Sequence, residues 1–146
     1  MKNSVFVFFI GIFLSACSVE PQEIQYGEDA CDFCKMNIVD RQHATELVSS
    51  KGKAYKFDAI ECMMNYLNRN VIESENMAFI LVMDYNQPGV LIDAKEAFYI
   101  YSENISSPMG AFLSAVDSEE VANQIVEEKS GEVFGWKLLK ERYKVR

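Results

Sequence analysis

Histidine is the scarcest reactive residue in this chain of 146 residues, which contains only His43. A serine hydrolase triad would have to use that one side chain, and no nucleophile-elbow motif accompanies it. The sequence also lacks a glycine-rich loop of the kind that cradles phosphates. Catalysis therefore has little support, and we expect a protein that is not an enzyme.

Basic residues are also few, with 14 Lys and Arg against 22 Asp and Glu and a formal net charge of −8. Without residues 1–16, whose one charged residue is Lys2, the chain carries 13 basic and 22 acidic residues, a net charge of −9. Nucleic-acid binding needs a basic surface, and adsorption to anionic lipid needs basic residues as well. The charge balance therefore excludes both as the main function.

No hydrophobic run is long enough to span a bilayer, because the N-terminal run covers only Val5–Leu14. It is typical of the apolar region of a secretory signal. Leu14-Ser15-Ala16-Cys17 follows and resembles the bacterial lipoprotein box, whose cysteine receives lipid and becomes the first mature residue. We predict a signal peptide over residues 1–16, a palmitate-bearing Cys17 and a tether over residues 17–30, on the periplasmic side of either the inner or the outer membrane. The alternative is an ordinary cleaved signal with an incidental cysteine.

Three cysteines remain in the mature domain: Cys31, Cys34 and Cys62. Thiols outside the cytosol usually pair in disulfides. An odd number leaves at least one thiol unpaired unless a ligand occupies it.

The pattern of residues 31–146 predicts an α+β domain built from two similar strand-strand-helix-strand lobes, at about 31–86 and 87–146. Asp58-x-x-Glu61 and Asp117-x-x-Glu120 lie 59 positions apart, and each resembles a capping box before a helix. The predicted strands are 44–50, 53–57, 77–85, 90–93, 98–101, 111–116 and 133–135, and the predicted helices start at 58, 117 and 136.

The stretch CDFCKM at residues 31–36 admits four interpretations. The Cys31/Cys34 pair could be a thioredoxin-type redox dithiol. With Cys62 and His43 it could complete a zinc site. It could instead bind Cu(I), which favours thiolate and thioether donors, and Met36 points in that direction. A structural disulfide would use the same residues.

The other sulfur atoms differ in their expected surroundings. If Cys34-Lys35-Met36 is extended, its first and third side chains share one face and can reach one ion. Cys62 points away from the apolar stripe of its helix, so it could be a further ligand or a free thiol, whereas Met63 and Met64 lie on the stripe and are expected in the core. Met109 sits in a Pro-Met-Gly loop, where a ligand role and a structural role are both open.

These residues together resemble the NosL family of copper-binding lipoproteins, which are encoded with nitrous oxide reductase. The resemblance includes the lipobox at Cys17, runs over most of residues 31–135 and so does not rest on one motif. Its other motifs in this chain are Cys34-Lys35-Met36, Lys56-Phe57-Asp58-x-x-Glu61-Cys62, Ala97-Phe98-Tyr99 and Ser107-Pro108-Met109-Gly110.

The resemblance implies a fold like part of organomercurial lyase and a monomeric carrier of Cu(I). It also implies delivery of copper to the ABC-type maturation machinery of nitrous oxide reductase. By position, Cys34 and Met36 correspond to the family's Cys-x-Met copper pair and Met109 to its Pro-Met-Gly loop. Many members lack counterparts of Cys31 and Cys62, so the remaining ligand is open among His43, Met109, Cys31 and Cys62. General copper or zinc handling without a reductase partner, or thiol–disulfide exchange, are the alternatives.

Overall fold

The computed structural model describes residues 18–70 and 74–145. The chain forms three α-helices, one 3-10 helix and seven strands within those residues, and the predicted α+β class is confirmed. In chain order the elements are β1 (Thr45–Ser49), β2 (Ala54–Phe57), α1 (Ile60–Arg69), η1 (Ser74–Asn76), β3 (Met77–Met83), β4 (Leu91–Asp93), β5 (Phe98–Tyr101), β6 (Leu113–Val116), α2 (Glu119–Lys129), β7 (Glu132–Phe134) and α3 (Trp136–Tyr143).

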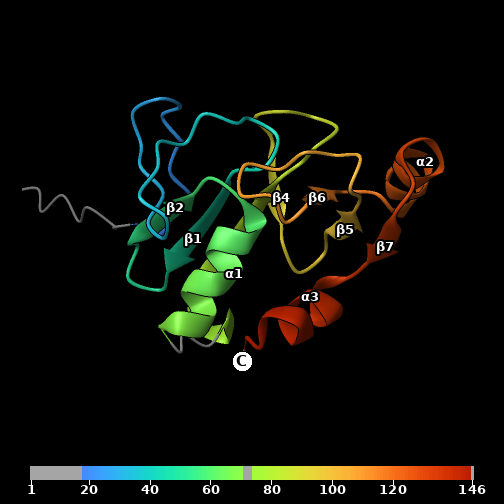
Figure 1. Cartoon of the computed structure of the whole chain (residues 1–146). Helices are drawn as coiled ribbons and strands as arrows, with labels where there is room; N and C mark the ends of the chain where they lie inside the picture. Colours follow the sequence, from blue (N-terminus) through green and yellow to red (C-terminus); the bar gives the residue numbers. More distant parts are fainter. Residues whose placement is uncertain (1–17, 71–73, 146) are drawn as a thin grey trace, which may run out of the picture.

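Two antiparallel sheets repeat one topology. Figure 1 shows β1 and β2 on one side of the molecule and β5, β6 and β7 on the other. The first has the strand order β2-β1-β3-β4 and the second the order β6-β5-β7. In each sheet the first strand along the chain lies between the second and the third, and a helix connects the second to the third. This shared order confirms the predicted pair of strand-strand-helix-strand units.

The strand expected over residues 90–93 at the start of the second lobe belongs instead to the first sheet. It is β4, and it pairs antiparallel with β3. A short turn closes this hairpin, with the Asp84 N–H donating to the Val90 carbonyl at 2.8 Å. Because such a turn returns the chain directly beside β3, the local pairing is favoured and the second sheet begins only at Phe98.

Neither predicted capping box caps its helix. The N-cap of α1 is Ala59, which offers no side-chain hydrogen bond. The N-cap of α2 is Ser118, whose Oγ accepts from the Val121 N–H at 3.5 Å. The carboxylates of the two D-x-x-E motifs therefore do not cap the helices. Those of the first motif, Asp58 and Glu61, form other contacts, which are described below.

The main core fills the space between the sheets and α1. The stripe Ile60, Met63, Met64 and Leu67 on α1 is 0–1 % exposed, which confirms the core role predicted for both methionines. Burying a side chain of this size contributes about 1.5–3 kcal/mol relative to full exposure. The stripe therefore fixes α1, and with it the residues of its first turn.

The second sheet has two apolar faces. Tyr99 lies on one face and belongs to the main core, whereas its neighbour Ile100 lies on the other face with Val116 and with Ala122 of α2. Successive side chains of a strand point to opposite faces. The sheet is thus enclosed between the main core and α2.

The predicted tether packs against the domain over much of its length. The Gln22 N–H donates to Glu46 Oε1 at 2.7 Å, Ile24 is 5 % exposed, and Lys56 Nζ lies 2.6 Å from Asp29 Oδ2. The backbone from Gln22 onward is therefore part of the folded unit. Cys17 and the predicted signal peptide lie outside the described residues.

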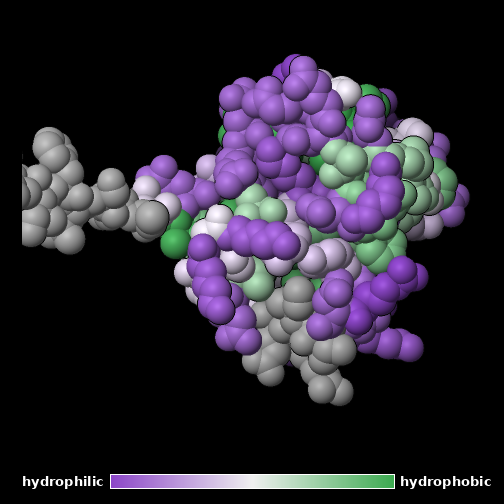
Figure 2. All heavy atoms as spheres, turned by 90° about the vertical axis from the view of Figure 1, so that its left-hand side faces the viewer, coloured by the Kyte–Doolittle hydropathy of each residue, from purple (hydrophilic) through white to green (hydrophobic). Residues whose placement is uncertain are grey.

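Hydrophilic residues predominate on the face shown in Figure 2, which is the left-hand side of Figure 1. Within residues 18–70 and 74–145, no helix combines the length and the apolar character that a membrane crossing requires.

Candidate metal centre

The loop that carries Cys31 and Cys34 is a tight hairpin. An isolated bridge joins Ala30 to Asn37, and the Cys31 N–H donates to the Met36 carbonyl at 2.8 Å. Lys35 adopts a left-handed backbone conformation with φ 68°. The expectation of an extended Cys34-Lys35-Met36 segment is therefore wrong, because the chain turns at Lys35.

β2 holds this hairpin against the start of α1. The Asp32 N–H donates to the Lys56 carbonyl at 2.8 Å, and the Lys56 N–H donates to Asp32 Oδ2 at 2.9 Å. β2 ends at Phe57 and leads directly into Asp58. The cysteines of the hairpin thus lie next to the first turn of α1.

Three thiols and one carboxylate meet at this place. The ligand atoms of Cys31, Cys34, Cys62 and Asp58 all lie within 4.8 Å of one another. Two sulfur ligands with metal bonds of about 2.3 Å lie at most about 4.6 Å apart across one ion. Small side-chain rotations would therefore bring the four groups onto a single ion.

Hydrogen bonds between these groups order the cluster. The Cys34 thiol donates to Asp58 Oδ2 at 3.5 Å, and the Cys34 N–H donates to Cys31 Sγ at 3.5 Å. Cys31 is 0 % exposed and Cys62 is 1 % exposed, whereas Cys34 is partly exposed. The cluster is buried except on the side of Cys34.

The three thiols share one negative charge. A hydrogen bond from the Cys62 thiol, with the Cys34 N–H adding to it, lowers the pKa of Cys31 to about 6. The same Cys62–Cys31 bond, with burial and Asp58 adding to it, raises the pKa of Cys62 far above its usual range. Burial, followed by Cys31 and Asp58, raises the pKa of Cys34 to about 11. At neutral pH the cluster therefore holds one thiolate and two protonated thiols.

Asp58 is 2 % exposed, and its Oδ1 is a buried oxygen without a hydrogen-bond partner among the described residues. A buried oxygen without a partner is uncommon in folded proteins and often marks a site for an ion or a water molecule. This oxygen lies in a group of soft sulfur donors, which bind Cu(I) or zinc ions. The donor set therefore fits a bound metal ion.

Met36 borders a hollow of about 240 Å³ that Asp58 also lines, together with Asn37, Val39, Asp40 and Pro108. The Met36 side chain is 54 % exposed. The structure thus places its thioether at the rim of the space that leads to Asp58. The turn at Lys35, not strand alternation, puts it there.

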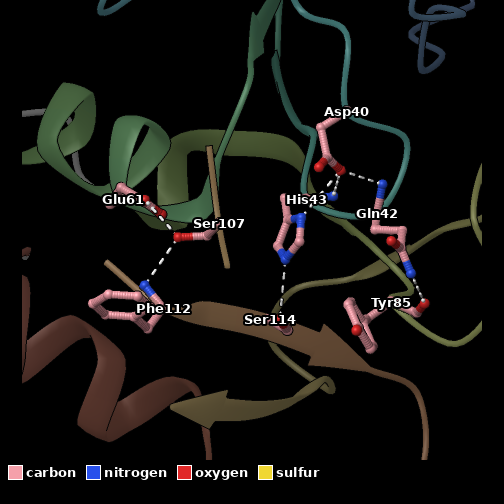
Figure 3. Close-up of polar contacts among 8 residues, drawn as sticks. All are labelled: Asp40, Gln42, His43, Glu61, Tyr85, Ser107, Phe112 and Ser114. Atoms are coloured by element: carbon pink, nitrogen blue, oxygen red, sulfur yellow. Dashed lines mark hydrogen bonds and ion pairs between the residues drawn. The ribbon is translucent and has the colours of Figure 1, made fainter. Parts of the chain in front are cut away.

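The loop with Met109 is tied to α1 by Glu61. Glu61 Oε1 accepts from Ser107 Oγ at 3.3 Å (Figure 3). The same oxygen accepts from the Ala111 N–H at 3.2 Å. Pro108 lines the hollow beside Met36, and Met109, the next residue, is 43 % exposed. Glu61, the residue before Cys62, therefore holds the Met109 loop at the rim of the hollow.

His43 does not belong to the cluster of Cys31, Cys34, Cys62 and Asp58. Its Nδ1 lies 3.0 Å from Asp40 Oδ1 and its Nε2 lies 3.1 Å from Ser114 Oγ, as Figure 3 shows. Both ring nitrogens are thus engaged in a link from the loop before β1 to β6. Although this Asp–His–Ser chain resembles a hydrolase triad, Ser114 is 0 % exposed and cannot meet a substrate.

Sequence reasoning missed Asp58 as a member of the site. The sequence pattern assigns Asp58 and Glu61 to a capping box, a local motif that many helix starts satisfy. The signal that could have identified Asp58 is its spacing, four residues before Cys62 and therefore on the approach to the same helical turn.

Comparison with known proteins decides the family. No curated protein matches the sequence. The sequence model of the NosL family matches residues 21–143. The chain belongs to the NosL family. This confirms the resemblance that the motifs indicated.

A solved NosL structure shares the fold. The crystal structure of the copper chaperone NosL from Shewanella denitrificans superposes with a TM-score of 0.70 at 17 % sequence identity. The match covers 82 % of this chain and 95 % of that chain. The matched region of the NosL family includes every residue of the cluster.

Proposed function

We propose that this NosL-family chain is a periplasmic lipoprotein that binds one Cu(I) ion and delivers it for the assembly of nitrous oxide reductase. The observation that carries the proposal is the meeting of three thiols with Asp58, which lines a hollow bordered by Met36. Membership of the NosL family and the similarity in fold to a copper chaperone support the same function.

The donor set favours Cu(I). Thiolates and thioethers are soft ligands, and Cu(I) is a soft ion, so its affinity for such a site exceeds that of the hard divalent cations. In the proposed site Cys31, Cys34 and Cys62 supply the sulfur ligands inside the protein. Met36 and Met109 lie at the rim, where a thioether can bind the ion as it enters or leaves.

The shape of the site suits a carrier better than an enzyme. The only nucleophile of the cluster that reaches the surface is Cys34, and the paired Ser114 is fully buried. Copper can pass between proteins when a ligand of the partner joins the ion before the first ligands leave. The hollow beside Asp58 gives such a ligand a path, and the chain can act as a monomer.

The delivery role includes a membrane anchor and a partner. We propose that Cys17 carries the lipid and that residues 18–21 connect it to the folded unit. The receiver would be the ABC-type maturation complex of the reductase. We expect the genes of this maturation complex to lie beside the gene of this chain. We also expect the reductase to lose copper when the chain is deleted.

The test is a Cu(I) titration of the reduced protein against a competing chelator. We expect one ion per chain, copper–sulfur scattering in the X-ray absorption spectrum, and a large loss of affinity in Cys34→Ser. Met36→Leu should weaken binding less, because a neutral thioether contributes less than a charged thiolate. Met77→Leu, which removes a thioether that does not line the hollow, is the matched control and should leave the affinity unchanged. Micromolar binding that Cys34→Ser does not alter would refute the proposal.

A further inference from the structure

Only one thiol of the cluster can meet a molecule from outside. Cys31 and Cys62 are 0 % and 1 % exposed, and Cys34 is partly exposed. An external thiol or disulfide must therefore react at Cys34 first, since sulfur–sulfur exchange requires direct contact between sulfur atoms.

Cys31 is the better placed of the two buried thiols to react with Cys34. The hairpin folds the two residues together, with the Cys34 N–H on Cys31 Sγ at 3.5 Å and the Lys35 N–H on the Cys31 carbonyl at 3.0 Å. Cys62 stands on α1, whose apolar stripe is locked in the core. A Cys31–Cys34 bond stays within one hairpin turn, whereas a Cys34–Cys62 bond would join the hairpin to a packed helix and constrain both.

We propose that Cys31 and Cys34 form a reversible disulfide in the copper-free protein, with Cys34 as the sulfur that external partners attack. The inference rests on the proposed function, because this disulfide removes two of the three sulfur ligands and so closes the copper site. The partner it requires is a dithiol reductase, which opens the site before copper is loaded. Bound copper, in turn, occupies both sulfurs and prevents the disulfide.

The reaction balances with a disulfide as oxidant. The Cys34 thiol gives up its proton and attacks a disulfide R–S–S–R, a Cys34–S–S–R bond forms, and one R–S⁻ leaves and takes up a proton. The Cys31 thiolate then attacks Cys34 Sγ, the Cys31–Cys34 bond forms, and the second R–S⁻ leaves and takes up a proton. Two protein thiols have lost two electrons and two protons, and the oxidant has become two thiols. A dithiol reductase reverses both steps.

The experiment starts from the full chain in its reduced, copper-free state and treats it with oxidised glutathione. The protein is then denatured, alkylated, and digested with trypsin and a glutamate-specific protease. Cleavage after Glu28 and Lys35 gives a peptide with Cys31 and Cys34, and Cys62 falls in another peptide. We expect the first peptide to be two hydrogen atoms lighter and unalkylated, and Cys62 to be alkylated. A cross-link to Cys62, or full alkylation of Cys31, Cys34 and Cys62, would overturn the proposal.

Three variants separate the roles of the thiols. Cys31→Ser should accumulate a stable glutathione adduct on Cys34, because the second step is lost. Cys34→Ser should form no adduct. Cys62→Ser is the matched control, and it should still form the disulfide. An adduct on Cys31 in Cys34→Ser, or loss of the disulfide in Cys62→Ser, would contradict the assignment. The near-ultraviolet circular dichroism of each variant verifies that it is folded.

A copper titration of both redox forms distinguishes this inference from the proposed function. The reduced chain should bind one Cu(I), and the oxidised chain should lose this stoichiometric binding until a dithiol is added. If the reduced chain fails to bind, the proposed function fails. If the oxidised chain binds Cu(I) as tightly as the reduced chain, only the proposed closure of the copper site by the disulfide is refuted.

Discussion

The number of thiols that bind copper can be counted from the pH dependence of the affinity. Cu(I) binds thiolates, so each thiol that is protonated in the free protein must release its proton when the ion binds. The pKa of Cys31 is about 6 and the pKa of Cys34 is about 11, while that of Cys62 lies far above its usual range. Between pH 7 and 9 Cys31 is therefore already ionised, and the other two thiols are not.

The expected slope follows from this difference. Each proton released on binding lowers the apparent dissociation constant about tenfold per unit rise in pH, which is about 1.36 kcal/mol. If Cys31, Cys34 and Cys62 all bind, two protons leave and the affinity rises about 100-fold per pH unit. If only Cys31 and one other thiol bind, the rise is about tenfold. Below the Cys31 pKa of about 6, Cys31 also takes up a proton, so the slope there increases by one proton.

The assay is a competition titration under anaerobic conditions with an aromatic-nitrogen chelator whose own protonation lies well below the range. The same series on Cys62→Ser provides the control, because the variant should lose one proton from its slope. A wild-type affinity that does not change between pH 7 and 9 would refute the reasoning. An identical slope in wild type and Cys62→Ser would remove Cys62 from the ligand set.

Three further predictions concern the surroundings of the site. Replacing Glu61 by alanine leaves the polar groups of loop 107–111 without their acceptor, so the free energy of unfolding should fall by about 1–3 kcal/mol; urea denaturation measures this, and an unchanged midpoint would contradict it. Burial alone would raise the pKa of Asp29, but its hydrogen bonds and the charge of Lys56 lower this pKa below its usual value. The Asp29–Lys56 pair therefore stabilises the fold at pH values above the pKa of the unfolded carboxyl group. This contribution is lost as the pH falls through the lower pKa of the folded state. Lys56→Met should therefore flatten the acid side of the stability curve, and an acid limb of unchanged steepness would count against the ion pair. Cys17→Ser should abolish incorporation of labelled palmitate and release the protein from membrane fractions, and a variant that still carries the label would exclude Cys17 as the anchor.

Much of the fold could be predicted because its signals are local. The period of the apolar residues on α1 identified the buried stripe, and the order of strands and helices revealed the repeated unit. β4 was misplaced because a three-residue strand carries no information about its partner. Its pairing with β3 depends on the turn at residues 84–90. The stability of this turn relative to other possible connections cannot be judged from one sequence.

The site was predictable in its sulfur atoms and not in its geometry. Cys34 and Cys62 were identified from the motif and from the helical wheel, and the structure brings them together with Cys31. The turn at Lys35 was not foreseen, because a left-handed lysine is uncommon and nothing in its neighbours demands one. His43 attracted attention as the lone imidazole, yet its two nitrogens are used to join the loop before β1 to β6.

The two helix starts explain why the sequence pattern misassigns Asp58 and what the first lobe does with it. In the second lobe Ser118 caps α2 in the ordinary way. In the first lobe Ala59 occupies the equivalent position without a side-chain cap, and this omission costs about 1 kcal/mol of helix stability. The carboxylates that flank it serve other groups: Asp58 contacts Cys34, and Glu61 holds the Met109 loop. Side-chain capping of the helix start is thus missing only in the lobe that carries the thiols. Departures from local sequence preferences are expected where function constrains the side chains. The two lobes thus share one topology, and the uncapped helix start distinguishes the lobe that carries the candidate metal site.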